Sequence, residues 1–417
     1  MDKSIPPVRL QGRIAPPCSK SYAQRALALS LLAEGTSVLR NIEFCDDTLS
    51  AMRCIETLGA RVERIDETTL SVTGGLHPSG NLLDVGESGL ATRLFTPIAS
   101  LWNSPIVIEG RGSLLHRPMG MMAEPLRSLG VAVRDGGGVL PIEVCGPLDG
   151  GEITVDGSLS SQFITGLLMA LPLAARDTVL KVRNAASTPY IDMTVDTVER
   201  FGGHILHNDY SEFFIEGGQH YTAADYSIEG DWSAAATLLV AGAIAGEVTV
   251  ENISQLSKQA DTAVCRALVR AGASLISDDR SLTAVHRQLS AFEFDATDCP
   301  DLFPALVALA AAAEGESTIV GTSRLEHKES HRAETLREEY AKLGIEVDIS
   351  TENIMKVHGG AIHAARTESH NDHRIAMSLA ISALRCRDGE VIIEGAEAVA
   401  KSYPTFFEDL KQLAISN

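Results

Sequence analysis

A recurring pattern of hydrophobic and polar positions divides the chain into alternating helices and strands. Five segments place a helix-like stretch before a glycine and a strand-like stretch after it: CIETLGARVERI, EPLRSLGVAVRD, DTVERFGGHILH, RALVRAGASLIS and REEYAKLGIEVDI. Their glycines, at positions 59, 130, 202, 272 and 344, follow one another at intervals of 71, 72, 70 and 72 residues. A glycine directly after a helix commonly closes it with a positive φ. The spacing predicts a repeated helix–turn–strand unit.

A second pattern recurs with the same period. Ala-rich apolar stretches end in a turn and lead into strands at LLAEGTSVLRNI, PLAARDTVLKVRN, AIAGEVTVENI, AAAEGESTIVGT and RCRDGEVIIEGA. A truncated copy, FEDLKQLAISN, places Ala414 another 70 residues after Gly344. Two patterns in phase predict six copies of one α/β unit, each too small to bury its own apolar face. Six units group as three plus three, so we expect an α/β or α+β chain with two similar domains.

Each predicted unit has two loops, and the first loop opens the apolar helix. These helix starts are CSKSYAQR (18–25), GESGLATR (86–93), SLSSQFIT (158–165), GDWSAAAT (230–237), DCPDLFPA (298–305) and HNDHRIAM (370–377). Ser, Asp and Asn are good N-caps there, which is the purely structural interpretation. Helix N-termini repeated on one face would also suit phosphate or carboxylate, because they offer unpaired N–H groups and positive dipole ends. Three of these loops carry basic residues, namely Lys20 with Arg25, Arg93, and Arg374.

The second loop follows the strand of each unit. The series is EFCDDT, RGSLLHRP, ASTPYID, QLSKQADT, SRLEHKESHR and AVAKSYP. The charges of the fifth loop, taken alone, are typical of a solvated helix face. If both loop sets face one cleft, however, seven cations converge there: Lys20, Arg25, Arg117, Lys328, Arg332, Arg374 and Lys401. Arginine forks and lysine point charges favour a small anion with more than one phosphate or carboxylate, and Glu329 and Asp301 are the candidate proton-transfer carboxylates.

Composition narrows the classes of partner. The formal charge of the 417 residues is −20, which argues against nucleic acid and requires any anion site to gather its positive charge locally. No apolar run approaches the roughly 20 residues of a membrane helix, and the first residues lack a signal-peptide pattern. The seven cysteines are scattered without a CxxC pair, so neither disulfides nor a zinc site is expected and a reducing cytoplasm fits.

Other site chemistries have little support in the sequence. There is no GxxxxGK[ST] phosphate loop, and GRGSLL lacks the third glycine of a dinucleotide fingerprint. No HExxH or paired Cys/His spacing indicates a metal. His373 suits either a triad base or a hydrogen-bonded structural histidine, but no GxSxG elbow accompanies it.

Ten stretches, in order from residue 19, carry a resemblance to a known family. They are SKSYAQRALALSLLAEGTS, GESGLATRLF, HRPM, GSLSSQFITGLLMALPL, STPYID, EGDWSAAA, PD (300–301), KESHR, NDHRIAM and AKSYPTFFEDL. The chain thereby resembles the 5-enolpyruvylshikimate-3-phosphate synthases, the enolpyruvyl transferases of the shikimate pathway to chorismate and aromatic amino acids. The resemblance implies two domains, each of three βαβαββ units in an inside-out α/β barrel, with the site in the interdomain cleft. It places the domains at 19–229 and at 1–18 plus 230–417.

The resemblance also implies a reaction. The 5-hydroxyl of shikimate 3-phosphate adds to C2 of phosphoenolpyruvate while C3 is protonated, and the tetrahedral intermediate then eliminates phosphate. No cofactor is implied, and we expect a monomer. By motif, shikimate 3-phosphate would contact Lys20, Ser21, Arg25, Ser160, Ser161, Gln162, Ser187, Tyr190, Asp301 and Lys328. Phosphoenolpyruvate would contact Lys20, Gly89, Arg117, Gln162, Arg332, Arg374 and Lys401. Asp301, Glu329 and Lys20 would be catalytic, with Asp301 the base near the 5-hydroxyl and Glu329 the acid/base at C3.

Some positions depart from the family pattern. Where the family commonly has GNAGT, this chain has Glu87 and Leu90; KESDR becomes KESHR with His331; and Arg324 replaces a common Asn.

Two alternatives to this function stay open at this point. One is the related UDP-N-acetylglucosamine enolpyruvyl transferase, although the cysteine of its usual GGC loop is absent from RGSLLHRP. The other is a non-catalytic anion-binding relative, which retention of the charged site residues disfavours.

Overall fold

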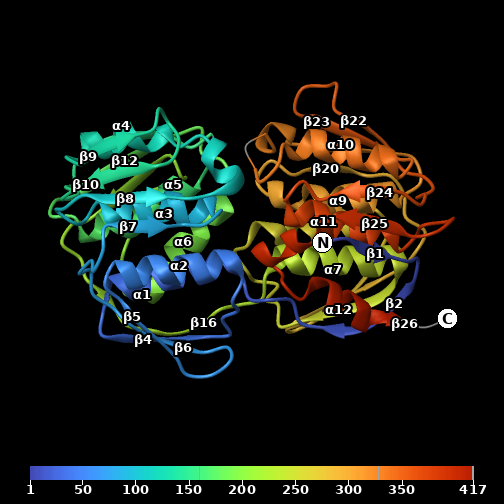
Figure 1. Ribbon diagram of the computed structural model, residues 1–417, viewed down its shortest axis with the longest axis horizontal. Coiled ribbons are helices and arrows are strands. Elements are labelled where there is room, and N and C mark those ends of the chain that lie inside the picture. Colours follow the sequence, from blue (N-terminus) through green and yellow to red (C-terminus); the bar gives the residue numbers. More distant parts are fainter. Residues whose placement is uncertain (159, 327, 416–417) are drawn as a thin grey trace. The chain divides into compact units, whose positions relative to one another are not determined.

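The computed structural model describes residues 1–158, 160–326 and 328–415 (Figure 1). The chain forms two compact units. The first unit is Cys18–Ile228, and the second unit combines Met1–Pro17 with Glu229–Asn417. Each boundary therefore lies one residue before the position expected from the sequence.

Two βαβαββ repeats lie consecutively in the first unit. One contains β7 (Leu82–Asp84), α3 (Gly89–Ala99), β8 (Ile106–Glu109), α4 (Ala123–Ser128), β9 (Ala132–Asp135) and β10 (Ile142–Cys145), with η1 (Gly112–His116) and η2 (Gly120–Met122) before α4. The other contains β11 (Glu152–Asp156), α5 (Gln162–Ala170), η3 (Leu171–Leu173), β12 (Thr178–Arg183), α6 (Thr188–Arg200), β13 (Leu206–Asn208) and β14 (Glu212–Ile215). Their sheets have the equivalent orders β7-β8-β10-β9 and β11-β12-β14-β13, and only the first pair of each sheet is parallel.

The third repeat of the first unit is assembled from both ends of that unit. It runs through α1 (Lys20–Leu32), β4 (Thr36–Arg40), α2 (Asp46–Thr57), β5 (Arg61–Arg64) and β6 (Leu70–Thr73). Its missing first strand is β16 (Asp225–Ser227), which pairs in parallel with β4 to give the order β16-β4-β6-β5. Two short strands next to β4 and β16 in the sequence also pair in parallel: β3 (Ala33–Glu34), which precedes β4, and β15 (Tyr221–Thr222), which precedes β16.

The second unit repeats this construction. One complete repeat contains β20 (Glu293–Asp295), η5 (Pro300–Leu302), α9 (Phe303–Ala311), β21 (Glu316–Val320), η6 (Thr322–Arg324), α10 (Arg332–Lys342), β22 (Glu346–Asp348) and β23 (Ile354–His358), in the sheet order β20-β21-β23-β22. Another begins with β2 (Arg9–Ile14) and continues through α7 (Trp232–Ala245), β17 (Gly246–Glu251), η4 (Ala260–Ala263), α8 (Val264–Arg270), β18 (Ser274–Asp278) and β19 (Ser281–Val285).

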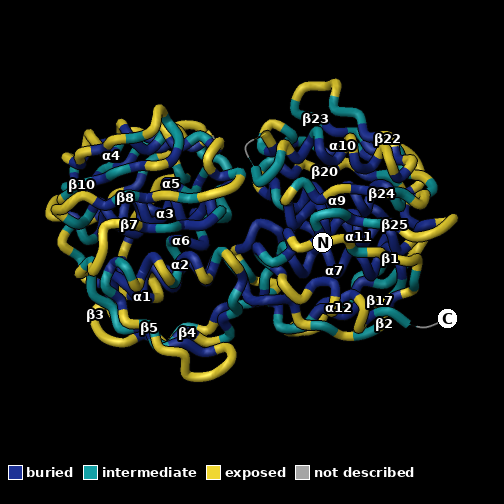
Figure 2. The backbone as a smooth tube through the Cα atoms, in the orientation of Figure 1, coloured by how far each residue is buried: buried dark blue, intermediate teal, exposed yellow. Residues whose placement is uncertain are grey.

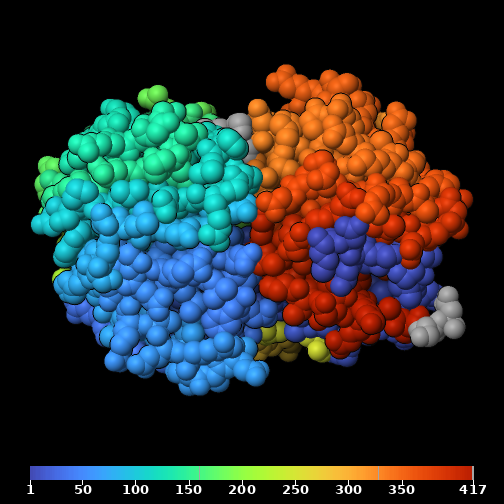
Figure 3. Space-filling view, viewed as in Figure 1, coloured from blue at the N-terminus to red at the C-terminus, as the bar shows by residue number. Residues whose placement is uncertain are grey.

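The last repeat is completed by the N-terminus. It contains β24 (Arg366–Glu368), α11 (His373–Ala383), β25 (Val391–Glu394), η7 (Ala396–Lys401) and α12 (Phe406–Leu413). The strand β1 (Lys3–Ile5) pairs with β25, whereas β26 (Ala414–Ile415) leaves this repeat to pair with β2. Figure 3 accordingly shows N-terminal residues, in blue, set among C-terminal residues in red.

The apolar helices form the interior of each unit. In the second unit α7, α9 and α11 pack on one another, and every residue of α9 and α11 is buried (Figure 2). In the first unit α3 packs on α5 and on α1, and α3 is likewise buried throughout. Helices surrounded on all sides must be apolar on all faces, which is why these segments read as Ala- and Leu-rich runs. The mixed helix-and-sheet class predicted from the sequence is confirmed.

The repeat glycines adopt the conformation that the pattern predicted. Their φ angles are +118° at position 59, +86° at 130, +82° at 202, +87° at 272 and +86° at 344. The six predicted starts of the apolar helices are also present, at α1, α3, α5, α7, η5–α9 and α11. Among the described residues, no helix combines the length and hydropathy needed to cross a membrane.

Candidate active site

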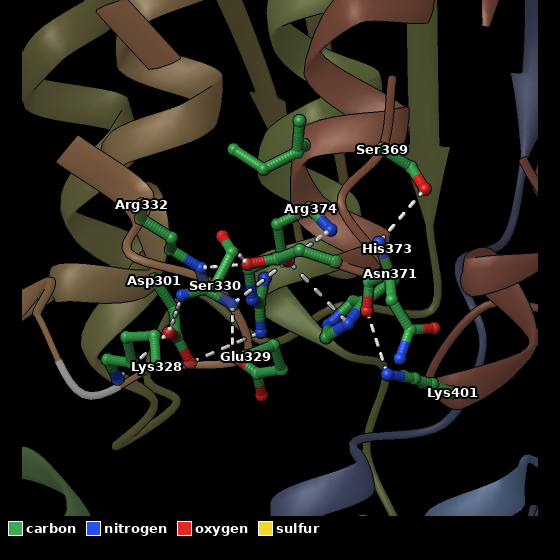
Figure 4. A network of polar contacts seen from close by, with 12 residues as sticks. Asp301, Lys328, Glu329, Ser330, Arg332, Ser369, Asn371, His373, Arg374 and Lys401 are labelled. Atoms are coloured by element: carbon green, nitrogen blue, oxygen red, sulfur yellow. Dashed lines mark hydrogen bonds and ion pairs between the residues drawn. The ribbon is translucent and has the colours of Figure 1, made fainter. Parts of the chain in front are cut away.

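A partly buried carboxylate, Asp301, lies at the centre of a polar network in the second unit (Figure 4). Its Oδ1 atom is 3.1 Å from Nζ of Lys328 and 2.8 Å from Nη1 of Arg332, and its Oδ2 atom is 3.2 Å from Nη2 of Arg374. Burial alone would raise the pKa of Asp301, but these three cations hold the pKa well below its ordinary value. Asp301 is therefore ionised at neutral pH in this arrangement.

Helix starts bring these side chains together. Asp301 lies in η5 directly before α9, Arg332 is the first residue of α10, and Arg374 is the second residue of α11. Lys328 comes from the loop before α10. Members of the two loop series recognised in the sequence thus meet within the second unit, around the carboxylate of Asp301. Lys328, Glu329, Ser330 and Arg332 of the fifth loop therefore belong to this network and not to a solvated helix face, whereas His331 is exposed.

Arg332 is the most heavily paired cation of the network. Its side chain is fully buried, and its Nε donates to Oδ2 of Asp372 at 2.7 Å, Nη1 to Asp301, and Nη2 to Oε2 of Glu329 at 2.6 Å. Burial opposes the charge of Arg332, but Asp372, Glu329 and Asp301 raise its pKa well above the ordinary value. Arg332 therefore joins the two predicted proton-transfer carboxylates, Asp301 and Glu329, through one guanidinium group.

Asp372 supports the network from the start of α11. As the N-cap, it accepts the backbone N–H of Arg374 at Oδ1, and its Oδ2 also accepts the hydroxyl of Ser330 at 3.0 Å. Sequence reasoning read Asp372 only as an N-cap and Ser330 only as part of a motif. The available signal was the position of Asp372 in one of the six repeated helix starts, two residues before Arg374.

Two lysines, Lys328 and Lys401, add further positive charge to this network. Burial, together with Arg332, lowers the pKa of the Lys328 ammonium, while Asp301 opposes that shift. Lys401, at the end of η7, donates from Nζ to the backbone oxygen of Asn371 at 2.8 Å. Lys401 therefore reaches the network through the loop that precedes α11.

A second buried carboxyl, Asp261, was not predicted as a site residue. It is 2% exposed, and it accepts a hydrogen bond from the hydroxyl of Ser233 at Oδ2, while Oδ1 has no hydrogen-bond partner among the described residues. Burial and the neighbouring charge of Asp301 raise the pKa of Asp261 to about 7, and Arg374 opposes that shift. The sequence held no signal beyond its membership of the loop QLSKQADT.

In the first unit, Lys20 and Arg25 lie on α1. Nζ of Lys20 is 3.0 Å from Oδ2 of Asp47, which lies in the first turn of α2. Arg25 is 1% exposed and donates to the hydroxyls of Thr194 and Thr165 and to the carbonyls of Ser21 and Tyr190.

Those four bonds tie α1 to α5 and α6. Burial lowers the pKa of Arg25 to about 10, so its guanidinium is still charged at neutral pH. The four bonds take up four of the five N–H groups of the guanidinium.

Gly89 and Arg117 are in direct contact. A Cβ placed on Gly89, the first residue of α3, would lie 2.7 Å from Nη1 of Arg117. The absent side chain therefore makes room for the guanidinium at this helix N-terminus. Gln162, the first residue of α5, accepts a hydrogen bond at Oε1 from Nη1 of Arg93 at 2.9 Å, and Arg93 also donates to the carbonyl of Pro118.

Serines lie at the starts of α5 and α6. Ser161 is the N-cap of α5, and the hydroxyl of Ser160 accepts the backbone N–H of Gln162 at 3.1 Å. Ser187, the N-cap of α6, is buried with a left-handed φ of +57°, and Tyr190 follows it in the first turn.

Three residues that depart from the family pattern, and His373, each lie in a different environment. A side chain on Gly112 would collide with the carboxylate of Glu87, so Glu87 lies against the turn at Gly112, whose φ is +60°. Leu90 is buried in the core of the first unit. His331 is an exposed N-cap of α10 whose side chain makes no cap hydrogen bond. His373 is 1% exposed, with Nδ1 4.0 Å from Oδ1 of Asp372.

Comparison with known proteins identifies the family. A family model for EPSP synthase (3-phosphoshikimate 1-carboxyvinyltransferase) matches residues 5–410. The chain is 36% identical over 419 residues to the 3-phosphoshikimate 1-carboxyvinyltransferase of Clostridium perfringens ATCC 13124, covering 98% of this chain and 97% of the relative. It is 35% identical over 427 residues to the enzyme of that name from Clostridioides difficile 630, covering 98% and 96%.

A solved structure agrees with the sequence matches. EPSP synthase from Acinetobacter baumannii superposes with a TM-score of 0.85 at 26% sequence identity, over 100% of this chain and 98% of that chain. The two-unit fold built from helix-centred βαβαββ repeats is therefore that of an enolpyruvyl transferase. With matches over almost its full length in sequence and structure, the chain belongs to the EPSP synthase (3-phosphoshikimate 1-carboxyvinyltransferase) family.

Proposed function

We propose that this chain transfers the enolpyruvyl group of phosphoenolpyruvate to the 5-hydroxyl of shikimate 3-phosphate and releases phosphate. The observation that carries the proposal is the pairing of Asp301 and Glu329 through one buried guanidinium, that of Arg332. Such a pair supplies two carboxylates for proton transfer, with cations beside them for anionic reactants. Family membership supports the same reaction, and the names of the relatives support this acceptor over UDP-N-acetylglucosamine.

In the addition step, Asp301 takes the proton of the 5-hydroxyl as its oxygen bonds to C2 of phosphoenolpyruvate. A carboxylate with a strongly lowered pKa is a weak base. Lys328 and Arg374 lower the pKa of Asp301 while they are paired with it. When the anionic groups of the substrates draw these cations to themselves, the pKa of Asp301 rises toward the range that suits a base.

Glu329 gives a proton to C3 of phosphoenolpyruvate in the addition and takes one from C3 in the elimination. In the addition it protonates C3 of phosphoenolpyruvate, which gives the tetrahedral intermediate. In the elimination the bond from C2 to the phosphate oxygen breaks, C3 loses a proton to Glu329, and the double bond of the enolpyruvyl group forms. Glu329 thus regains the proton that it gave to C3, and the proton that Asp301 took from the 5-hydroxyl leaves with the phosphate. The balance is one phosphoenolpyruvate and one shikimate 3-phosphate consumed, with one enolpyruvyl product and one phosphate released.

The cations bind the reactants and stabilise the charge that builds up on the departing phosphate. Phosphoenolpyruvate is assigned to residues at helix starts and to cations: Lys20, Gly89, Arg117, Gln162, Arg332, Arg374 and Lys401. The room that Gly89 leaves for Arg117 supports an anion site at the start of α3. Lys20 also acts catalytically, as a cation close to the reacting phosphate.

Shikimate 3-phosphate is assigned to a second group of side chains: Lys20, Ser21, Ser160, Ser161, Gln162, Ser187, Tyr190, Asp301 and Lys328. Arg25 belongs with them, since it fixes the carbonyls of Ser21 and Tyr190 and keeps one N–H beyond its four bonds. The three serines at the starts of α5 and α6 are hydroxyl donors of the kind that a phosphate accepts from.

The test is phosphate release from phosphoenolpyruvate with two acceptors, shikimate 3-phosphate and UDP-N-acetylglucosamine. The proposal predicts stoichiometric phosphate release with the first acceptor and none above background with the second. No release with shikimate 3-phosphate, from folded protein that binds it, would favour a non-catalytic anion-binding relative. We further propose that the chain acts as a cytoplasmic monomer, which light scattering of purified protein tests for the oligomeric state.

A further inference from the structure

The loop before α11 has an unusual backbone at two successive residues. His370 and Asn371 adopt left-handed φ angles of +51° and +55°. Non-glycine residues in this region each cost of the order of 1 kcal/mol and persist only where their surroundings hold them. The turn leads directly into Asp372, which binds Arg332 and caps α11. The conformation of this turn therefore sets the position of Asp372, the residue through which α11 contacts Arg332.

A buried glutamate on α10 holds one side of this turn. The side chain of Glu339 is 1% exposed, and its Oε1 accepts from Nε2 of His370 at 2.7 Å while Oε2 accepts the backbone N–H of Glu368 at 2.9 Å. Nζ of Lys342 contacts both carboxylate oxygens, at 2.7 and 2.8 Å. Burial alone would raise the pKa of Glu339, but these donors lower it. Glu339 is therefore an ionised anchor, so the imidazole Nε2 of His370 carries the hydrogen.

The opposite side of the turn faces the residues assigned to phosphoenolpyruvate. The carbonyl oxygen of Asn371 accepts from Nζ of Lys401 at 2.8 Å (Figure 4). The hydroxyl of Ser369 donates to the carbonyl of Gly395 at 2.8 Å. Asp372 contacts Arg332 through Oδ2 at 2.7 Å. One turn of four residues thus connects a buried anchor on α10 with Lys401 and Arg332.

We propose that Glu339 and His370 are positioning residues, which hold the 369–372 turn in the geometry that sets Lys401 and Arg332 for phosphoenolpyruvate. Neither residue belongs to the set assigned to substrate contact, and both act through the turn. The inference rests on the proposed function, because it takes Lys401 and Arg332 as phosphoenolpyruvate ligands. Loss of the anchor frees the turn from its left-handed conformation and moves the carbonyl that orients Lys401.

The experiment compares steady-state kinetics and thermal unfolding of four single variants. His370→Phe removes the donor to Glu339, whereas His370→Gln retains an N–H donor. Lys401→Met removes the proposed ligand itself. His358→Phe is the matched control, because His358 makes the same kind of pair with Glu316, at 2.9 Å, between β23 and β21 of the same unit. His370→Ala, which adds no volume, replaces the phenylalanine variant if that variant does not fold.

The expected result is a rise of about tenfold in the KM for phosphoenolpyruvate in His370→Phe. The KM for shikimate 3-phosphate stays within twofold, His370→Gln recovers most of the loss, and His358→Phe behaves as the wild type. The double variant of His370→Phe with Lys401→Met shows less than the product of the two single effects, because both act on one contact.

Two results overturn the inference. One is a His370→Phe variant whose KM for phosphoenolpyruvate matches that of His358→Phe. The other is a double variant whose effects multiply. A Lys401→Met variant with normal KM for phosphoenolpyruvate would instead refute the assignment of Lys401 under the proposed function, and the inference with it. That outcome is recognised by the Lys401 variant alone, so the two failures are distinguished.

Discussion

The Nη1 atom of Arg332 lies 2.8 Å from Oδ1 of Asp301, and the arginine side chain is completely shielded from solvent. The same guanidinium contacts Glu329 and Asp372. Removing one partner of a buried ionic network is strongly destabilising, because the remaining charges lose their compensation. Three carboxylates depend on Arg332, so its replacement is expected to affect folding as well as activity.

Arg332→Met is therefore predicted to lower the free energy of unfolding at neutral pH by about 3–5 kcal/mol. Arg337→Met provides the control on the same helix, since Arg337 is half-exposed and pairs with Glu334 at the surface. Its cost is expected to be at most about 1 kcal/mol. Urea denaturation followed by circular dichroism measures both, and equal losses in the two variants would contradict the assignment of Arg332 to a buried network.

Asp261→Asn should change the pH dependence of stability. The folded pKa of Asp261, about 7, lies above the ordinary value of 3.8, so between these values the folded protein holds a proton that the unfolded chain has lost. This carboxyl therefore makes the protein less stable as pH rises through that window, by up to about 1.4 kcal/mol per pH unit. Asparagine cannot titrate and removes that slope.

The measurement is the free energy of unfolding of wild type and Asp261→Asn from pH 4 to pH 7. Relative to the wild type, the variant should gain stability as pH increases. Asp279→Asn, at an exposed position, serves as the control and should run parallel to the wild type. A constant difference between Asp261→Asn and wild type across the range would show that Asp261 is ionised throughout.

Gly89→Ala tests the contact between Gly89 and Arg117. The new methyl group would meet the guanidinium at 2.7 Å, and the guanidinium is the flexible end of a side chain, so it shifts while the helix stays. We expect the melting temperature to stay close to wild type and the KM for phosphoenolpyruvate to rise roughly tenfold or more, as for loss of one charged hydrogen bond.

Gly80→Ala is the matched control for this substitution. A methyl group there meets nothing closer than 3.5 Å, and the backbone is not left-handed. Steady-state kinetics of both variants decide the matter. If the two variants share an unchanged KM for phosphoenolpyruvate, Arg117 has no part in binding it.

Arg25→Lys probes the bonds that tie α1 to α5 and α6. One ammonium cannot reach two threonine hydroxyls and two carbonyls that the planar guanidinium reaches together. The expected loss in unfolding free energy is about 3 kcal/mol, because buried acceptors are left unpaired. Arg40→Lys, in an exposed pair with Asp225, should cost less than about 1 kcal/mol in the same urea titration. Similar costs would mean that Arg25 is not a structural tie.

Much of the fold was predictable because local chemistry repeats along the chain. The glycines at 59, 130, 202, 272 and 344 predicted five helix ends, and all five have the positive φ that the pattern required. Strand pairing across long separations was not predictable from periodicity. β16 pairs with β4, β1 pairs with β25 and β26 pairs with β2. In each pair the two strands are more than 180 residues apart in the sequence.

The site was predictable as far as residue type indicates chemistry. Asp301, Lys328, Glu329, Arg332 and Arg374 were predicted as one group, and the structure joins them through Arg332 and Asp301. What the sequence could not show is which groups are already satisfied by the protein. Arg25 reads as a free cation but donates to four internal acceptors, and Asp372 reads as an N-cap but also binds Arg332.

The proton-transfer role of Glu329 is the central claim of this account, and Glu329→Gln tests it most directly. The substitution preserves the shape of the side chain that contacts Arg332 but removes its ability to give and take a proton. Glu326→Gln, an exposed position three residues earlier in the same loop, is the control. The measurement is kcat for phosphate release together with the Kd for shikimate 3-phosphate by calorimetry. We predict a fall in kcat of at least about 100-fold with Kd nearly unchanged, while Glu326→Gln keeps the wild-type rate. A Glu329→Gln enzyme that turns over at a near-normal rate would contradict the account.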